Sequence, residues 1–199
     1  MTTARDLILV ALALPAERSV AQGDLSLALA GAEAVDLLER GALRLDGDRM
    51  VPGPPVATGD RLLDEAAAAL TWRKPYDTVT EWLWRRGGAL AAAYVDELER
   101  ARLVIHPRGP LGLRSRRTVL AESQARRASE ERRATGEPVL AALMAAAGIE
   151  EKPDEAAEGL TGDAVTTVLA AVGDAVTQLE AERLRRDVEQ AAFDNIWRA

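Results

Sequence analysis

The feature that most constrains this chain is the spacing of its apolar residues, which recur at intervals of three and four. Such spacing places apolar side chains on one face of an α-helix. In Asp24–Arg40 this stripe consists of Leu25, Leu29, Ala32, Val35, Leu37 and Leu38, and Gly41 is well placed to end the helix. Similar patterns predict helices over Arg5–Leu14, Arg61–Leu70, Ala89–Arg102, Ala121–Thr135, Glu137–Gly148, Thr166–Leu179 and Arg183–Trp197, and another that starts at Asp77 or Thr78.

The composition agrees with close-packed helices. Hydrophobic residues make up 48% of the chain, but only 4% of residues are aromatic, and alanine and leucine dominate. We therefore expect residues 1–199 to form a single, mainly α-helical domain, with the very hydrophobic segment Thr166–Leu179 as its central helix. Two hairpins are predicted as well, one around Asp46 and Gly47, the other over Leu103–Leu120 with a basic second arm.

The residue types present exclude several kinds of chemistry. The chain has no cysteine, so disulfides, thiolate metal sites and thiol nucleophiles are absent. It has one histidine, His106, with no nearby residue that completes a nucleophile–base pair. No glycine-rich loop follows a strand, as dinucleotide binding requires. We expect no catalytic residue, no metal and no cofactor, and hence a protein that is not an enzyme.

Two apolar runs raise the question of membrane insertion. Leu7–Leu14 is short and adjoins Asp6, which favours a first core helix over a signal peptide. Ala164–Leu179 is interrupted by Gly173 and Asp174 and is too short to span a bilayer. We expect a cytoplasmic protein, with any membrane contact peripheral and at the inner face.

Charge is distributed unevenly along the chain. The formal net charge is −7, yet residues 85–136 contain twelve arginines against six acidic residues. A segment of net charge +6 within an acidic protein suggests one face that meets an anion. The remainder is too acidic for bulk binding to nucleic acid, and the helix Asp24–Arg40 is a poor surface for a DNA backbone.

The segment "TWRKPYDTVTEWLWRRGG", 71–88, contains three of the four tryptophans. On a helical wheel Trp82 falls on the apolar face with Val79 and Leu83, so we expect it in the core. Trp84 falls off that face, beside Arg85 and Arg86. One interpretation is a lipid or anion site in which the arginines meet phosphate and Trp84 lies at the interface. The other is that Trp84 packs under a neighbouring loop.

The second hairpin carries a further basic group. Arg114 and Arg116 are two residues apart, so in a strand they point the same way and can grip a phosphate, with Arg117 beside them. Leu111 and Leu113 at the tip could contact a membrane or another subunit. A solvated edge strand protected by charge is the alternative.

A third group of arginines, over 126–133, favours an exposed helix with pairs four residues apart. It alternates arginine and glutamate: Arg126, Arg127, Arg132 and Arg133 with Glu122, Glu130 and Glu131.

Three segments together resemble the Golgi phosphoprotein 3 family, including its bacterial members. They are "GAEAVDLLERGALRL" (31–45), "ATGDRLLDEAAAAL" (57–70) and "DTVTEWL" (77–83), in this order and spacing. The string "TGDRLLDEA" is the most specific match. The resemblance implies a mostly helical domain with a hydrophobic central helix and a protruding β-hairpin. It also implies a non-enzymatic adaptor, because eukaryotic members bind phosphatidylinositol 4-phosphate on Golgi membranes and connect glycosyltransferases to vesicle coats.

The lipid-binding residues implied by the resemblance are not kept in this sequence. In that family the lipid headgroup pocket uses one tryptophan and three arginines. A gapless alignment places these four residues at Ala21, Ala30, Gly87 and Leu90 of this chain. Arg85 and Arg86 lie close to two of these positions and could substitute, with Trp84 replacing the lost ring.

Two functions follow as expectations. The first is a peripheral membrane or adaptor protein that binds an anionic phospholipid headgroup or another phosphate-bearing ligand through Trp84, Arg85, Arg86 and the hairpin arginines. The second is a protein-interaction module that forms a homo-oligomer through Leu111 and Leu113. Nucleic acid is not an expected partner.

Overall fold

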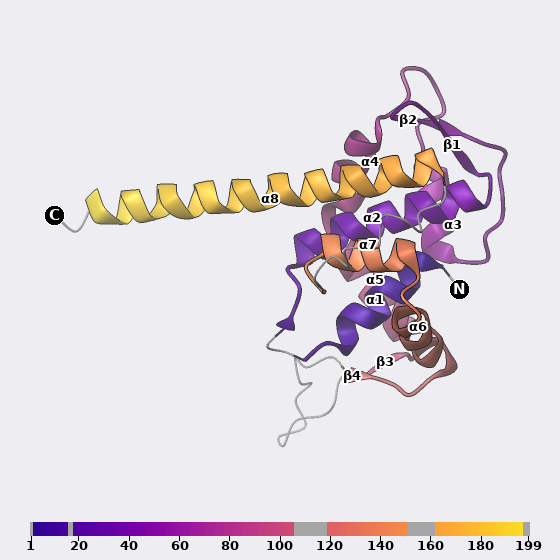
Figure 1. The fold of residues 1–199 in the computed structure, drawn as a ribbon, viewed down its shortest axis with the longest axis horizontal. Helices are drawn as coiled ribbons and strands as arrows, with labels where there is room; N and C mark the ends of the chain where they lie inside the picture. Colours follow the sequence, from indigo (N-terminus) through magenta and orange to yellow (C-terminus); the bar gives the residue numbers. More distant parts are fainter. Residues whose placement is uncertain (1, 16–17, 106–118, 151–161, 197–199) are drawn as a thin grey trace.

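In the computed structural model, which describes residues 2–15, 18–105, 119–150 and 162–196, helix α2 is enclosed by other helices. Every residue of α2 from Asp24 to Leu37 is buried. Figure 1 shows α2 passing through the body of the molecule with helices on several sides. The helices that contact it include α1, α5, α7 and α8. Their bounds are α1 Thr3–Ala13, α2 Gln22–Glu39, α5 Leu90–Arg100, α7 Pro138–Ala146 and α8 Asp163–Ile196.

The mainly α-helical fold is confirmed, but the central helix is α2 and not Thr166–Leu179. That segment belongs to α8, which packs one side against α2. Its Val168, Val172 and Val176 are buried, whereas Thr166 and Asp174 are exposed. Although Thr166–Leu179 is the more hydrophobic stretch, α2 can be enclosed because its side chains are small and its acidic residues find partners inside the protein.

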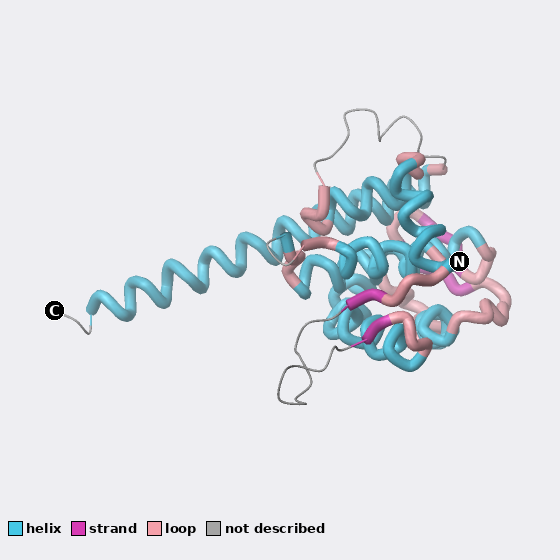
Figure 2. The backbone as a smooth tube through the Cα atoms, turned by 90° about the horizontal axis from the view of Figure 1, so that it is seen from below, coloured by secondary structure: helices cyan, strands magenta, loops and turns pink. Residues whose placement is uncertain are grey.

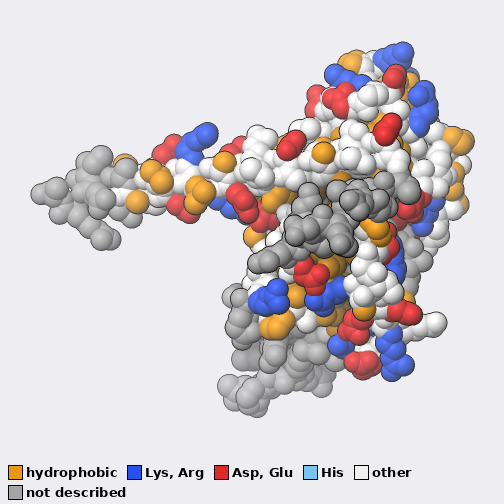
Figure 3. All heavy atoms as spheres, viewed as in Figure 1, with side chains coloured by type: hydrophobic (Ala, Val, Ile, Leu, Met, Phe, Trp, Pro, Cys, Tyr) orange, Lys and Arg blue, Asp and Glu red, His pale blue; other side chains and the backbone are white. Residues whose placement is uncertain are grey.

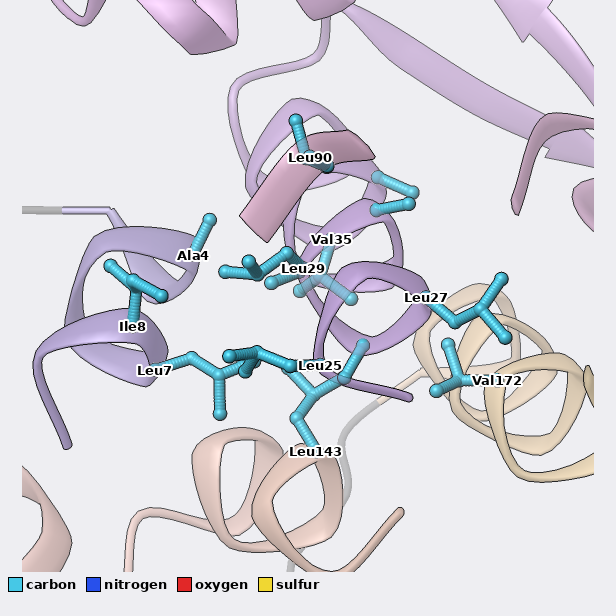
Figure 4. Packing of buried hydrophobic residues seen from close by; sticks show 14 of the residues in the cluster. Ala4, Leu7, Ile8, Leu25, Leu27, Leu29, Val35, Leu90, Leu143 and Val172 are labelled. Carbon is cyan, nitrogen blue, oxygen red and sulfur yellow. The ribbon is translucent and has the colours of Figure 1, made fainter. Parts of the chain in front are cut away.

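Packing around α2 brings in apolar side chains from helices distant in sequence. Figure 4 shows Leu7 of α1 and Leu143 of α7 directed toward Leu25 of α2, and Val172 of α8 facing Leu27. All five residues belong to one buried cluster. The core is therefore a single one, built around α2.

Helix α8 approaches α2 closely at Gly31. A Cβ atom added at Gly31 would lie 2.3 Å from Val172 Cγ2, closer than any stable contact allows. Glycine is thus required here so that the two helices can pack together.

We expect Gly31→Ala to lower the free energy of unfolding by about 1–3 kcal/mol, because overpacking outweighs the better helix propensity of alanine. Val172→Ala should cost less in the Gly31→Ala background than in the wild type, since it removes the clashing methyl group. Urea unfolding of both single variants and the double variant measures this coupling. Strictly additive costs would contradict it.

Two short antiparallel hairpins accompany the helices, and Figure 2 shows them as separate magenta segments. In the first, β1 (Leu43–Asp46) pairs with β2 (Arg49–Pro52) around Gly47, whose φ is +62°, as the Asp-Gly signal predicts. Two backbone hydrogen bonds, Met50 N–H to Asp77 and Val79 N–H to Asp48, attach this hairpin to the start of α4 (Val79–Arg86).

The specific string at 58–66 forms the start of α3 (Arg61–Ala68). Asp60 caps this helix by accepting hydrogen bonds from the backbone of Leu62 and Leu63. The Thr58 hydroxyl donates to Asp64 at 2.7 Å. The polar residues of this string therefore have a structural role in fixing the loop and the helix end.

The second hairpin is present at its base, where β3 (Val104–Ile105) pairs with β4 (Val119–Leu120). It leads into α6 (Gln124–Ala134), and a short 3₁₀ turn, η2 (Gly87–Ala89), joins α4 to α5. The segment predicted to be an acidic connector, Lys152–Gly162, lies outside the described residues except for Gly162. None of the helices described is both long and apolar enough to cross a membrane.

Candidate functional site

Trp82 belongs to the core, as the helical wheel predicts. It is fully buried, and its Nε1–H donates a hydrogen bond to the backbone oxygen of Ala30 at 3.2 Å. Thr78 caps the start of α4 in a capping box with Glu81. Trp84 is half-buried and packs against the core.

Arg85 is held on the surface by partners of its own chain. Its guanidinium forms an ion pair with Asp77, donates to the backbone oxygen of Ala69 at 3.1 Å and lies 5.4 Å from the centre of the Trp82 ring. Partial burial acts to raise the pKa of Asp77, but hydrogen bonds from Thr71 and Arg85 outweigh it and lower that pKa. Arg85 is thus accessible to solvent, with its charge already matched.

Arg86 turns inward and lies 16% exposed against Glu33, a fully buried carboxylate. The pair is bidentate, with Nε to Oε2 at 2.8 Å and Nη2 to Oε1 at 2.9 Å. Nη2 also donates to the backbone oxygen of Leu62 at 3.0 Å, and the Tyr94 hydroxyl donates to Glu33 at 3.1 Å. We call Glu33, Arg86 and Tyr94 the buried polar network.

Burial dominates the protonation of this network. It raises the pKa of Glu33 above the ordinary range of a glutamate, although Arg86 and Tyr94 oppose the shift. Burial, together with the nearby Glu33, also raises the pKa of Tyr94 well above its ordinary value. The network ties α2, α4 and α5 together, and it occupies the guanidinium of Arg86 that the sequence had suggested for an external phosphate.

Other acidic residues of α2 also point inward. Asp36 accepts backbone hydrogen bonds from Thr3 at 2.9 Å and Ala4 at 3.2 Å, so it caps α1. Asp24 is buried and pairs with Arg183 of α8 at 2.8 Å. The charge of α2 is therefore mostly neutralised inside the molecule.

The arginine-rich helix α6 agrees only in part with the prediction of exposed pairs four residues apart. Arg126 pairs with Glu122 and with Glu130, each at 2.8 Å, as predicted. Arg132 instead reaches the buried carboxylate of Asp6 and also pairs with Glu137 at 3.1 Å. Arg132 therefore anchors α6 to α1.

A pocket of about 560 Å³ opens between α1, the start of α2, α5, β4 and α6. Its described walls are mainly apolar, and Arg126 is the one ionisable side chain among them. The lining residues include Ala11, Leu12, Leu14, Val20, Gln22, Leu25, Ala91, Val95 and Leu120. An apolar pocket with one cation at its wall suits an amphipathic anion.

The family model for Golgi phosphoprotein 3 (GPP34) matches residues 4–193. The chain belongs to the Golgi phosphoprotein 3 family. A search of curated proteins gave no match.

The structure accounts for the four positions at which the Golgi phosphoprotein 3 resemblance places its lipid pocket. Ala30 and Leu90 are buried in the core, and a Cβ atom at Gly87 would already lie 3.2 Å from Leu27 Cδ2. At Gly87, close packing of η2 against α2 thus leaves little room for a larger side chain. Ala21, the fourth position, is exposed at the start of α2.

The pocket lies beside two of these positions, Ala21 and Leu90. Val20 and Gln22, which flank Ala21, line it, and so does Ala91, which follows Leu90. Trp84, Arg85 and Arg86 do not line it. The sequence did not suggest this pocket, because its walls come from five separate segments.

The predicted site residues of the second hairpin are not among the residues that the structure describes. Arg114, Arg116, Arg117, Leu111 and Leu113 all lie outside the described residues, as does His106. Leu120 of β4 contributes to the wall, so the base of the second hairpin borders the pocket. No cluster of residues suited to hold a metal ion occurs in the part of the chain that the structure describes.

Proposed function

We propose that this member of the Golgi phosphoprotein 3 family is a non-enzymatic peripheral membrane protein that binds an anionic phospholipid. The observation that carries the proposal is the apolar pocket beside two of the positions that the resemblance implies for lipid binding, with Arg126 at its wall. The apolar walls would receive the hydrocarbon part near the glycerol, while Arg126 meets the phosphate.

Arg126 can change partners at small cost. Glu122 and Glu130 are both well exposed, so their ion pairs with Arg126 are weak in water. A guanidinium has five donors in a planar fork, which matches a phosphate group. A lipid whose apolar part is held in the pocket therefore places its phosphate next to a suitable cation.

The composition of the pocket favours binding over catalysis. General acid–base chemistry requires a titratable group within hydrogen-bonding reach of the substrate. Among the described residues that line the pocket, Arg126 is the one titratable side chain, and it stays protonated. A role as an adaptor between a membrane and other proteins is consistent with such a site.

Sedimentation with lipid vesicles tests the proposal. We expect the protein to pellet with vesicles of phosphatidylcholine and phosphatidylglycerol, and not with phosphatidylcholine alone. Arg126→Gln should weaken binding roughly tenfold, because it removes one charge-assisted contact. Ala11→Trp, which fills the pocket from the half-buried wall of α1, should weaken binding without changing the charge.

The matched control is Arg61→Gln on α3. Arg61 is also a surface arginine with two carboxylate partners, Glu65 and Glu97, but it lies outside this pocket. Negligible binding of the wild type to both kinds of vesicle would rule out the proposal. An equal loss in Arg61→Gln would show a general charge effect and no specific site. Competition by free inorganic phosphate would indicate a soluble ligand in place of a lipid.

A further inference from the structure

The last part of α8 leaves the body of the protein. Figures 1 and 2 show this helix extending far beyond the other elements. Arg183 is the last residue of α8 with a described ion pair to the body, at 2.8 Å from Asp24, and Leu184 and the residues after it are exposed where described. We call residues 181–196 the arm. A single helix of this length is marginally stable in water, so an isolated arm gains from a partner.

An apolar stripe runs along the arm and does not face the body. Ala181, Leu184, Val188 and Ala191 recur at intervals of three and four, and Leu184 and Val188 are 66% and 69% exposed. At 100° per residue this stripe is rotated by roughly 130° from the row that packs on the body, which contains Val172 and Val176. Figure 3 shows hydrophobic side chains on the arm among acidic and basic ones.

The charges beside the stripe select the partner and its direction. In a heptad repeat, Ala181 and Val188 occupy the a positions and Leu184 and Ala191 the d positions. Glu180 then lies at a g position and Arg185 at an e position. In a parallel, in-register pair, Glu180 of each copy lies beside Arg185 of the other. An antiparallel pair would instead place Arg185 near Arg185, or Asp187 near Asp187.

Neither Glu180 nor Arg185 has an ion-pair partner among the described residues of its own chain. An anionic membrane is a poor occupant, because residues 180–196 contain five acidic residues against three arginines. We propose that the arm pairs in parallel with the arm of a second copy of this chain. This pairing is independent of the lipid pocket and of the hairpin tip.

Single engineered cysteines test this pairing, because the chain has no cysteine of its own. In a parallel pair, residue 184 of one arm contacts residue 184 of the other at a separation that a disulfide can bridge. Under mild oxidation we expect Leu184→Cys to form covalent dimers at least about tenfold faster than Arg186→Cys. Arg186 is the control because it lies on the outer face of the pair.

Charge exchange tests the direction of the pair. Glu180→Arg added to Leu184→Cys should slow cross-linking, and the further change Arg185→Glu should restore it, because the pairs reform with opposite signs. Equal cross-linking at 184 and 186 would overturn the proposal, as would slowing without rescue.

Sedimentation equilibrium of the full chain tests the pairing of the arms without any engineered cysteine. We expect a concentration-dependent dimer for the wild type and a monomer for Val188→Asp. A strict monomer in both, or a dimer that persists in Val188→Asp, contradicts pairing through the arm. Circular dichroism checks that the body stays folded, as expected for a residue 69% exposed.

Discussion

Replacing Arg86 with alanine is expected to lower the free energy of unfolding by about 3–5 kcal/mol, as measured by urea denaturation at neutral pH. The reason is that Glu33 is fully buried and would lose its bidentate partner. An uncompensated charge in the interior costs far more than the lost packing of the arginine stem.

The neighbouring Arg85 provides the control. It is nearly half exposed and pairs with Asp77 at the surface, so Arg85→Ala should cost no more than about 1 kcal/mol. Substitution of two adjacent arginines of the same helix by alanine would thus lower the free energy of unfolding by amounts that differ severalfold. Equal losses in both variants would mean that the buried polar network does not carry the stability assigned to it.

The cost of Arg86→Ala should also depend on pH. Burial already raises the pKa of Glu33, and removing Arg86 raises it further, so the folded state binds a proton more tightly than the unfolded one. The penalty is fully present above the folded pKa and shrinks as the pH falls toward the ordinary pKa of glutamate. A difference from the wild type that stays constant between neutral and mildly acidic pH would contradict this explanation.

Trp82→Ala is the second change with a large expected effect, again about 3–5 kcal/mol. The variant removes a fully buried ring at the junction of α4 and α2 and also the hydrogen bond to Ala30. Trp82→Phe should cost less, because it keeps most of the buried apolar volume. Chemical denaturation of both variants gives the comparison.

Trp72 is the matched control for the second prediction. It lies in the same tryptophan-rich segment, but its side chain is 53% exposed. Trp72→Ala should therefore change the free energy of unfolding by less than about 1 kcal/mol. If the two alanine variants were equally destabilised, the segment would be acting through something other than the burial of Trp82.

Much of the fold could be predicted because local chemistry agrees with tertiary structure. The three- and four-residue spacing locates α1, α2 and α5, and the Asp-Gly pair locates the first hairpin. Asp60 and Thr78 cap the helices that follow them. The wheel also places Trp82 correctly, since a helix of known start has a calculable apolar face.

Which charged side chains are buried was much harder to predict. Whether an acidic side chain faces solvent or the interior depends on a partner that is distant in sequence, as Glu33 and Arg86 show, which are 53 positions apart. One signal was present. Glu33 interrupts a series at intervals of four that contains Leu29 and Leu37, and a carboxylate within an apolar row indicates an internal partner.

The candidate site was missed for a related reason. Its walls are apolar residues from α1, α2, α5 and β4 that look like ordinary core residues in sequence. The sequence directed attention to the arginines around Trp84, because clustered charge is visible along a chain and a pocket between helices is not. The family resemblance led to the neighbourhood of this pocket only through Ala21 and Leu90, neither of which carries the side chain that the resemblance implies.

The enclosure of α2 has a consequence for how the molecule can move. Since this one helix contributes to the packing of α1, α4, α5, α7 and α8 alike, the described helices share one core built around it. A shared core of this kind disfavours hinged opening of two lobes around a bound molecule. Entry to a pocket in its wall must rely on small displacements of side chains and connecting segments, which favours a rigid receptor over a clamp.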